Sequence, residues 1–243
     1  MKALAKVFNK SNVSIKYSLI DKESDNLFVF FNGAADRSKA YPHFQRISWA
    51  SEFPGNCLYI SDPLLEQNEN ISIGWYAGGR GYDVESAVDA LILDVLRSRK
   101  LKKLFSWGSS AGGYASLRLA GRMENVTAVA INPQTDILKY HERHVNEYFQ
   151  VAFPGEGGKG VAILENGENF NCLRPPVASS EYFLIQNVKD FFHYKNHYLP
   201  FLDLSREKNF SSQFKTWIYE DSAGHGPERK EMVSEILKEL LVD

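Results

Sequence analysis

The run Leu27–Phe31, LFVFF, constrains the fold of this 243-residue chain more than any other feature. Five consecutive apolar residues leave no polar face, which is typical of a strand covered on both sides of a sheet. Similar short runs occur at Lys103–Trp107, Val126–Asn132 and Tyr182–Gln186, and longer segments with helical spacing separate them. Strands that alternate with crossover helices indicate an α/β fold with a mostly parallel, doubly wound sheet.

Further strands and helices complete this prediction. Val13–Leu19 alternates in period two and predicts an early edge strand, and two more strands are expected at Asn56–Ser61 and Phe214–Tyr219. Amphipathic or buried helical patterns predict helices at Val84–Arg99, Ser110–Met123 and Glu228–Leu241. The sheet is therefore expected to have about seven or eight strands with helices on its faces.

Length and charge favour one globular domain over residues 1–243. Domains average roughly 150 residues, and no linker or repeat divides this chain. The 28 Lys and Arg against 30 Asp and Glu give a net charge of −2, which argues against non-specific nucleic-acid binding. Asp136–Arg174, which contains the glycine-rich Gly155–Gly160, is expected to be an insertion or lid near the carboxyl ends of the strands.

Cysteine usage and apolar runs indicate the compartment. Cys57 and Cys172 form neither a disulfide framework nor a metal-binding cluster. The amino-terminal residues lack the apolar stretch of a signal peptide, and no run of about 20 apolar residues could span a bilayer. The expected location is the cytoplasm.

The segment Lys103–Gly113, KLFSWGSSAGG, carries the strongest chemical signal. It contains the pattern G-x-S-x-G at Gly108–Gly112, after an apolar strand and before a helix. A serine at such a sharp turn has a strained backbone, and small neighbours relieve the crowding around it. The turn exposes the hydroxyl and directs the amino terminus of the helix at a developing oxyanion. Ser110 is the predicted nucleophile.

A serine nucleophile needs a base, and the base needs a group that orients it. His225 lies in EDSAGHGP, a loop between the last strand and the last helix, and is the predicted base. Asp190, at the carboxyl end of the strand EYFLIQ, is the favoured acid because the order Ser–Asp–His matches hydrolases of this type. Asp136 is the next candidate, whereas Asp221 is close enough to His225 in sequence to cap the loop instead.

An oxyanion hole needs two N–H donors. Ala111, the residue after the predicted nucleophile, supplies one. The second is expected from the loop after LFVFF, where Ala34 is preferred and Gly33 is the alternative.

Candidate substrate contacts are fewer and less specific. The stretch Trp75–Tyr82, WYAGGRGY, precedes a helix whose amino terminus could receive a phosphate. It lacks the P-loop pattern, so a turn is the simpler interpretation. Tyr76 and Arg80 from this stretch, together with Asn32, are predicted to contact substrate.

Two histidine pairs have spacings that can chelate a metal. His141 and His144 are three residues apart, and His193 and His197 are four apart. No acidic or cysteine partner at a metal-site spacing accompanies either pair, so no metal is predicted.

The order of these motifs resembles that of the α/β-hydrolase superfamily. A strand followed by Asn32-Gly33, then Gly108–Gly112, Asp190 and His225, spans most of the chain. A typical hydrolase has His-Gly where this chain has Asn32-Gly33. The resemblance implies an α/β-hydrolase fold with a Ser-His-Asp triad.

A narrower resemblance involves proteins of bacterial surface-glycan systems. Phe30–Gly33, Ser61–Leu64, Gly108–Gly113 and Asn132–Gln134 resemble capsule polysaccharide O-acetyltransferases and the acetyltransferase-like component of accessory secretion systems. This similarity implies acyl transfer to a sugar hydroxyl, with acetyl-CoA as donor and a glycan as acceptor.

The residues alone leave the acceptor open, because hydrolase and acyltransferase use the same groups and differ in how well the site excludes water. The leading prediction is O-acetyl transfer to or from a bacterial surface polysaccharide. A small-ester carboxylesterase is the alternative. A non-catalytic hydrolase-fold protein of a glycan-assembly or secretion complex is the third hypothesis.

Overall fold

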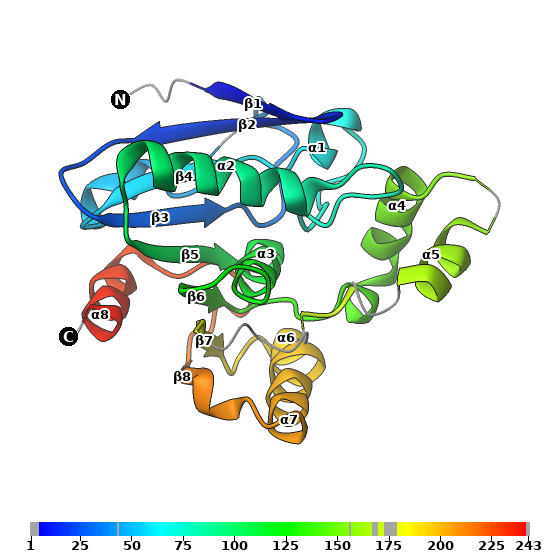
Figure 1. The fold of residues 1–243 in the computed structure, drawn as a ribbon. Coiled ribbons are helices and arrows are strands. Elements are labelled where there is room, and N and C mark those ends of the chain that lie inside the picture. The colour runs from blue at the N-terminus through cyan, green and yellow to red at the C-terminus, as the bar shows by residue number, and fades with distance from the viewer. Residues whose placement is uncertain (1–4, 43, 156, 167–169, 173–178, 242–243) are drawn as a thin grey trace.

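The computed structural model describes residues 5–42, 44–155, 157–166, 170–172 and 179–241. Its centre is one eight-stranded sheet with the order β1-β2-β4-β3-β5-β6-β7-β8 (Figure 1). The strands are β1 (Lys6–Lys10), β2 (Val13–Ile20), β3 (Asn26–Phe31), β4 (Asn56–Ile60), β5 (Lys103–Ser109), β6 (Val126–Ile131), β7 (Glu181–Asn187) and β8 (Phe214–Tyr219).

Strands β3 to β8 are parallel, and the two amino-terminal strands are antiparallel to their neighbours. The mostly parallel sheet confirms the predicted fold class. The prediction that Val13–Leu19 forms an edge strand is wrong, because β1 pairs with β2 and takes that place. The sequence of β1, KVFNK, is polar and mostly exposed, so it carries no hydrophobic pattern that would reveal a strand.

Helices lie on both faces of the sheet. They are α1 (Leu64–Gln67), α2 (Val84–Arg99), α3 (Ala111–Ala120), α4 (Glu142–Ala152), α5 (Gly158–Asn166), α6 (Phe191–His193), α7 (Leu199–Glu207) and α8 (Lys230–Leu240). Short 3₁₀ segments are η1 (Ile47–Glu52), η2 (Ile137–Lys139) and η5 (Ser211–Gln213), and a π-helical turn at Tyr194–Tyr198 joins α6 to α7. None of the helices in the described ranges is long and apolar enough to cross a membrane.

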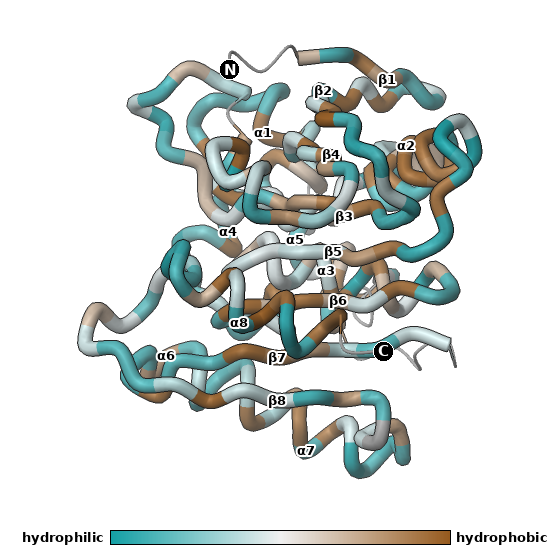
Figure 2. Tube along the Cα trace, turned by 90° about the vertical axis from the view of Figure 1, so that its left-hand side faces the viewer, coloured by the Kyte–Doolittle hydropathy of each residue, from teal (hydrophilic) through white to brown (hydrophobic). Residues whose placement is uncertain are grey.

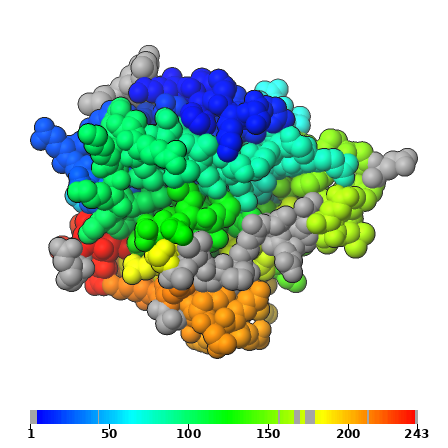
Figure 3. All heavy atoms as spheres, in the orientation of Figure 1, coloured from blue at the N-terminus to red at the C-terminus, as the bar shows by residue number. Residues whose placement is uncertain are grey.

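The segment between β6 and β7 includes residues 136–174, for which an insertion or lid is predicted. It contains α4 and α5, which extend beyond the edge of the sheet (Figures 1 and 3). Residues 156, 167–169 and 173–174 of this segment lie outside the described ranges.

Alternate residues of β3 enter two separate hydrophobic cores. Leu27, Val29 and Phe31 pack with residues of α2 and α3 on one face. Phe28 and Phe30 pack on the other face with residues of η1 and α8. All five are at most 1% exposed, which confirms that LFVFF is covered on both sides. Figure 2 shows the hydrophobic residues concentrated along the central strands.

The turn between β5 and α3 can be built only from small residues. Ser110 has φ 57° and ψ −120°, a strained conformation for a residue with a side chain. A Cβ at Gly108 would lie 2.2 Å from the carbonyl of Gly112, and a Cβ at Gly112 would lie 2.4 Å from the carbonyl oxygen of Phe31. The two glycines therefore permit the close contact of α3 with β5 and β3.

Parallel strands bring the loops after β3, β5, β6, β7 and β8 to the same edge of the sheet. These loops carry, in chain order, Gly33, Ser110, Gln134, Asp190 and His225. Residues up to about 190 positions apart in sequence are therefore candidates for one site.

We predict that Gly112→Ala lowers the free energy of unfolding by about 2–3 kcal/mol, because the added methyl group meets backbone that cannot move independently. Urea unfolding followed by circular dichroism measures the change. Gly160→Ala is the control, since Gly160 is an exposed helical residue with no atom within 4 Å of an added Cβ. It should be neutral or stabilising by roughly 0.5–1 kcal/mol. Equal effects of the two substitutions would contradict the packing argument.

Candidate active site

Ser110 lies at the strained turn and is 8% exposed. Its backbone is fixed by hydrogen bonds from its N–H to the Ile131 carbonyl (3.0 Å) and from the Gln134 N–H to its own carbonyl (3.2 Å). The side-chain amide of Gln134 donates from Nε2 to Ser110 Oγ over 2.9 Å. Ala111 begins α3, so its N–H belongs to the first helical turn, where amide groups have no intrahelical acceptor.

His225 is hydrogen-bonded to Asp190, and its side chain is partly exposed to solvent. Its Nδ1 lies 2.5 Å from Asp190 Oδ2, and its side chain is 35% exposed whereas that of Asp190 is 3% exposed. Ser110 and His225 line the same cavity. Within the described residues no hydrogen bond joins them, and the hydrogen bond of Ser110 Oγ is the one from Gln134.

A second histidine, His193, also binds Asp190. Its Nδ1 lies 3.0 Å from Oδ1, and its ring stacks on that of His225 with centroids 3.8 Å apart and planes at 6°. Burial opposes ionisation of Asp190, but the hydrogen bonds from His193 and His225 outweigh it and hold the pKa of the carboxyl below its usual value. Burial lowers the pKa of His193 despite its contact with Asp190, so this imidazole is neutral beside an ionised carboxylate.

The side chains of Asp190, His193 and His225 place potential metal ligands within 4.8 Å of one another. In the structure, the Nδ1 atoms of both histidines are engaged with the carboxylate of Asp190. A divalent metal that used these atoms would have to replace both hydrogen bonds. The arrangement therefore fits a carboxylate that orients two imidazoles.

Two buried asparagines hold the loop that carries His225. Asn132, at the end of β6, donates from Nδ2 to the Gly226 carbonyl over 2.8 Å. Asn187, at the end of β7, donates from Nδ2 to the Gly224 carbonyl over 2.8 Å. Both side chains are fully buried, so the backbone on either side of His225 is tied to the ends of two central strands.

The other two candidate acids lie in different surroundings. Asp136 caps η2 by accepting from the Leu138 N–H (2.9 Å), and it also accepts from Asn171 Nδ2 (3.3 Å). Asp221 accepts from the Ala223 N–H in its own loop (2.9 Å). Of the three aspartates, Asp190 is the one that contacts His225 in the described part of the chain.

The loop after β3 contains Gly33 and Ala34, the two residues predicted to supply the second oxyanion donor. The Gly33 N–H donates to Gln45 Oε1 over 3.0 Å, whereas the Ala34 N–H has no partner among the described residues. Asn32 is buried, with its N–H donating to Tyr76 Oη (2.8 Å) and its Oδ1 accepting from the Gln45 N–H (2.9 Å). Asn32 and Tyr76 thus hold this loop, and Ala34 has the free donor.

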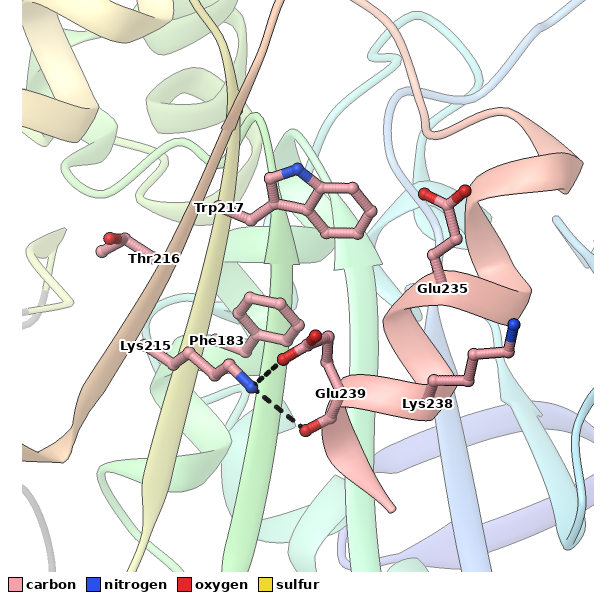
Figure 4. A pocket seen from close by; sticks show the side chains of 7 residues that line it. All are labelled: Phe183, Lys215, Thr216, Trp217, Glu235, Lys238 and Glu239. Carbon is pink, nitrogen blue, oxygen red and sulfur yellow. Dashed lines mark hydrogen bonds and ion pairs between the residues drawn. The ribbon is translucent and has the colours of Figure 1, made fainter. Parts of the chain in front are cut away.

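The cavity around Ser110 has a volume of about 520 Å³. Its lining includes Ser110, His225, Gly33, Ala34, Trp49 and Tyr140. Two predicted substrate contacts lie elsewhere: Tyr76 is 4% exposed beneath the loop, and Arg80 lines a separate cavity of about 340 Å³. A further cavity, of about 470 Å³ between β8 and α8, is lined by Trp217 and Phe183 but by none of the predicted site residues (Figure 4).

A buried ion pair that sequence analysis missed lies against the same cavity. Arg46 binds the carboxylate of Glu228 through Nε and Nη2, both at 2.6 Å, and its Nη2 donates to Ser109 Oγ over 2.9 Å. Trp107 Nε1 donates to the same carboxylate over 2.6 Å. The prediction that the last helix begins at Glu228 is wrong, since α8 begins at Lys230. Arg46 and Glu228 are 182 residues apart, and no local pattern links them.

No protein-family model matches the chain, and no curated protein matches it. Solved structures do. A mutant of the capsule O-acetyltransferase of Neisseria meningitidis serogroup A, in complex with CoA, aligns with a TM-score of 0.70 and 14% identity over 98% of this chain and 95% of that one. An acetyl xylan esterase from Paenibacillus sp. R4 aligns with a TM-score of 0.61 and 13% identity over 98% and 87% of the two chains.

A glycosylation-associated protein complex from Streptococcus agalactiae gives a TM-score of 0.71 at 13% identity. The match covers 98% of this chain and 47% of that chain. The strand order, the turn at Ser110 and these similarities all indicate the same fold. The chain therefore has an α/β-hydrolase fold, and its structure is similar to that of a capsule O-acetyltransferase.

Proposed function

We propose that this protein is a serine acyltransferase that moves an acetyl group from a thioester donor, such as acetyl-CoA, to a hydroxyl of a bacterial surface polysaccharide. The observation that carries the proposal is the turn that presents Ser110 in one cavity with His225, whose imidazole is bound to Asp190. The structural similarity to a capsule O-acetyltransferase crystallised with CoA supports the choice of donor and acceptor.

The first half-reaction forms an acyl-enzyme. Ser110 Oγ attacks the thioester carbonyl while His225 Nε2 takes the serine proton. The N–H groups of Ala111 and Ala34 stabilise the oxyanion, and the Ala34 donor has no partner to give up among the residues that the structure describes. Collapse of the intermediate breaks the C–S bond, and the imidazolium of His225 returns the proton to the leaving thiolate.

The second half-reaction transfers the acetyl group. His225 takes the proton of a sugar hydroxyl, and the hydroxyl oxygen attacks the ester carbon of acetylated Ser110. Asp190 keeps the imidazole in the tautomer with a free Nε2 and stabilises the imidazolium that forms. Trp49 and Tyr140 line the cavity and provide aromatic faces on which a sugar ring can stack.

Ester hydrolysis is the second candidate function, and the exposure of His225 favours it. Its side chain is 35% exposed, so water can reach the base without any movement of the protein. An esterase would use the same residues and would differ only in the acceptor that attacks acetylated Ser110. The similarity to an acetyl xylan esterase is in line with this alternative.

Ser110→Ala should lower p-nitrophenyl acetate turnover by at least about 10³-fold, because the covalent intermediate can no longer form. It should also abolish labelling by a serine-directed fluorophosphonate. The matched control is Ser109→Ala, whose hydroxyl binds Arg46. That variant should still be labelled, and mass spectrometry should locate the label on Ser110. If Ser110→Ala turns over p-nitrophenyl acetate at the wild-type rate, Ser110 is not the nucleophile.

Transfer and hydrolysis are separated by supplying acetyl-CoA with and without capsule polysaccharides. We expect release of CoA to accelerate in the presence of an acceptor polymer and ¹H NMR to show new O-acetyl signals on that polymer. Ser110→Ala should give neither change. Release of acetate at a rate that no polysaccharide alters would identify an esterase instead.

Asp190→Asn should reduce kcat by up to about 10⁴-fold, because the wrong imidazole tautomer is then favoured. It should also destabilise the fold at neutral pH by roughly 3 kcal/mol, since the buried carboxylate binds two imidazoles. The lowered pKa of Asp190 means that this stabilisation is complete above about pH 4 and decreases as the pH falls further.

Urea unfolding of wild type and Asp190→Asn from pH 7 to pH 3 tests the charge dependence. The difference in the free energy of unfolding should shrink towards the acid end. Asp203→Asn, which removes an exposed partner of Arg206, is the control and should change stability by less than about 1 kcal/mol. A pH-independent difference for Asp190→Asn would show that its charge does not stabilise the fold.

A further inference from the structure

The orientation of the Gln134 side chain is fixed by Trp75. The indole Nε1 can only donate, and it donates to Gln134 Oε1. Both side chains are at most 1% exposed, so no solvent competes for this contact. The amide oxygen of Gln134 therefore faces Trp75, and the NH2 group faces the opposite way, towards the loop edge of the sheet.

The NH2 group of Gln134 donates to Ser110 Oγ over 2.9 Å. An NH2 group has two protons and no acceptor, so the Ser110 hydroxyl oxygen must accept from it. The hydroxyl then has its single proton left to donate, and Ser110 lines one cavity with His225. The amide thus sets the polarity of the Ser110 hydroxyl group.

The anchor for this arrangement is itself rigidly held. Trp75 and Tyr76 are consecutive residues with φ of 56° and 55°, a left-handed conformation that bulky side chains rarely adopt. The Tyr76 N–H donates to the buried carboxylate of Asp62 (2.9 Å), and its hydroxyl donates to the Ile60 carbonyl (2.8 Å). These bonds keep the indole of Trp75 in place against Gln134.

We propose that Gln134 is a positioning residue that commits the Ser110 proton to His225. As the Ser110 proton moves to His225 Nε2, negative charge grows on Oγ, and the N–H of Gln134 is already directed at it. The inference rests on the proposed acyl transfer, because it assigns roles within that reaction.

Gln134→Glu tests the polarity with almost no change of shape. The introduced carboxylate can still accept from Trp75, but it accepts the Ser110 proton instead of donating to the Ser110 oxygen. We expect kcat/KM for p-nitrophenyl acetate at pH 8 to fall about 100-fold, the scale of removing one preorganised donor. The rate of phosphonylation of Ser110 should fall in parallel.

The pH dependence separates polarity from packing. When the introduced carboxyl is protonated it can donate again, so the ratio of variant to wild-type kcat/KM should rise as the pH falls. His225, Asp190 and His193 are present in both proteins, so each variant rate is compared with the wild-type rate at the same pH. A purely structural effect of the substitution would leave the ratio constant with pH.

The outcomes distinguish this inference from the proposed function. If the wild type is active and Gln134→Glu has the same kcat/KM as the wild type at every pH, the role of Gln134 is overturned and the proposed acyl transfer is not. Absence of both turnover and phosphonate labelling in the wild type would overturn the acyl transfer and this inference together. If Gln134→Glu does not fold, Trp75→Phe decides, because loss of the indole N–H frees the amide to turn and should reduce kcat/KM by about tenfold. No loss in that variant would overturn the inference.

Discussion

The close contact of α3 with β5 and β3 is the constraint on which the rest of this structure depends. Gly108 and Gly112 leave no room for side chains, and the turn between them holds Ser110 at φ 57°. That geometry puts the serine, the first turn of α3 and the loop after β3 within one small region. The packing of the surrounding buried strands holds Ser110 in this strained conformation, because a single local contact could not maintain it.

Buried charged groups lie at the carboxyl ends of the parallel strands. Asp190 is hydrogen-bonded to His193 and His225, and Arg46 to Glu228 and Ser109. Buried charges are tolerated only when they are paired and hydrogen-bonded. The Asp190–His225 and Arg46–Glu228 contacts each join segments that follow different strands, so they also fix the relative positions of those segments. A single substitution at this edge is therefore expected to affect more than one functional group.

Much of this was predictable from the sequence where local pattern decides the outcome. The apolar run LFVFF, the stripe of α2 and the glycine-serine turn each depend on neighbouring residues, and each prediction matches the structure. The residues that surround the predicted site were not predictable in this way. Gln134 and Arg46 acquire their partners through contacts across the fold, and so does His193 in its stacking on His225. Polar residues after strands are also common in proteins without a site there. β1 escaped detection because an exposed edge strand needs no apolar face.

In the proposed reaction, the segment between β3 and the end of η1 connects the oxyanion donor with the acceptor. This segment carries Ala34, whose N–H has no partner among the described residues, and Gln45, which accepts from the neighbouring N–H of Gly33. The same segment contains Arg46, bound to Glu228 near the start of α8, and Trp49, which lines the cavity. A polymer that stacks on Trp49, as we propose, would therefore contact the segment that carries the proposed oxyanion donor. Water would make no such contact, so binding energy from an extended acceptor would accelerate transfer and not hydrolysis.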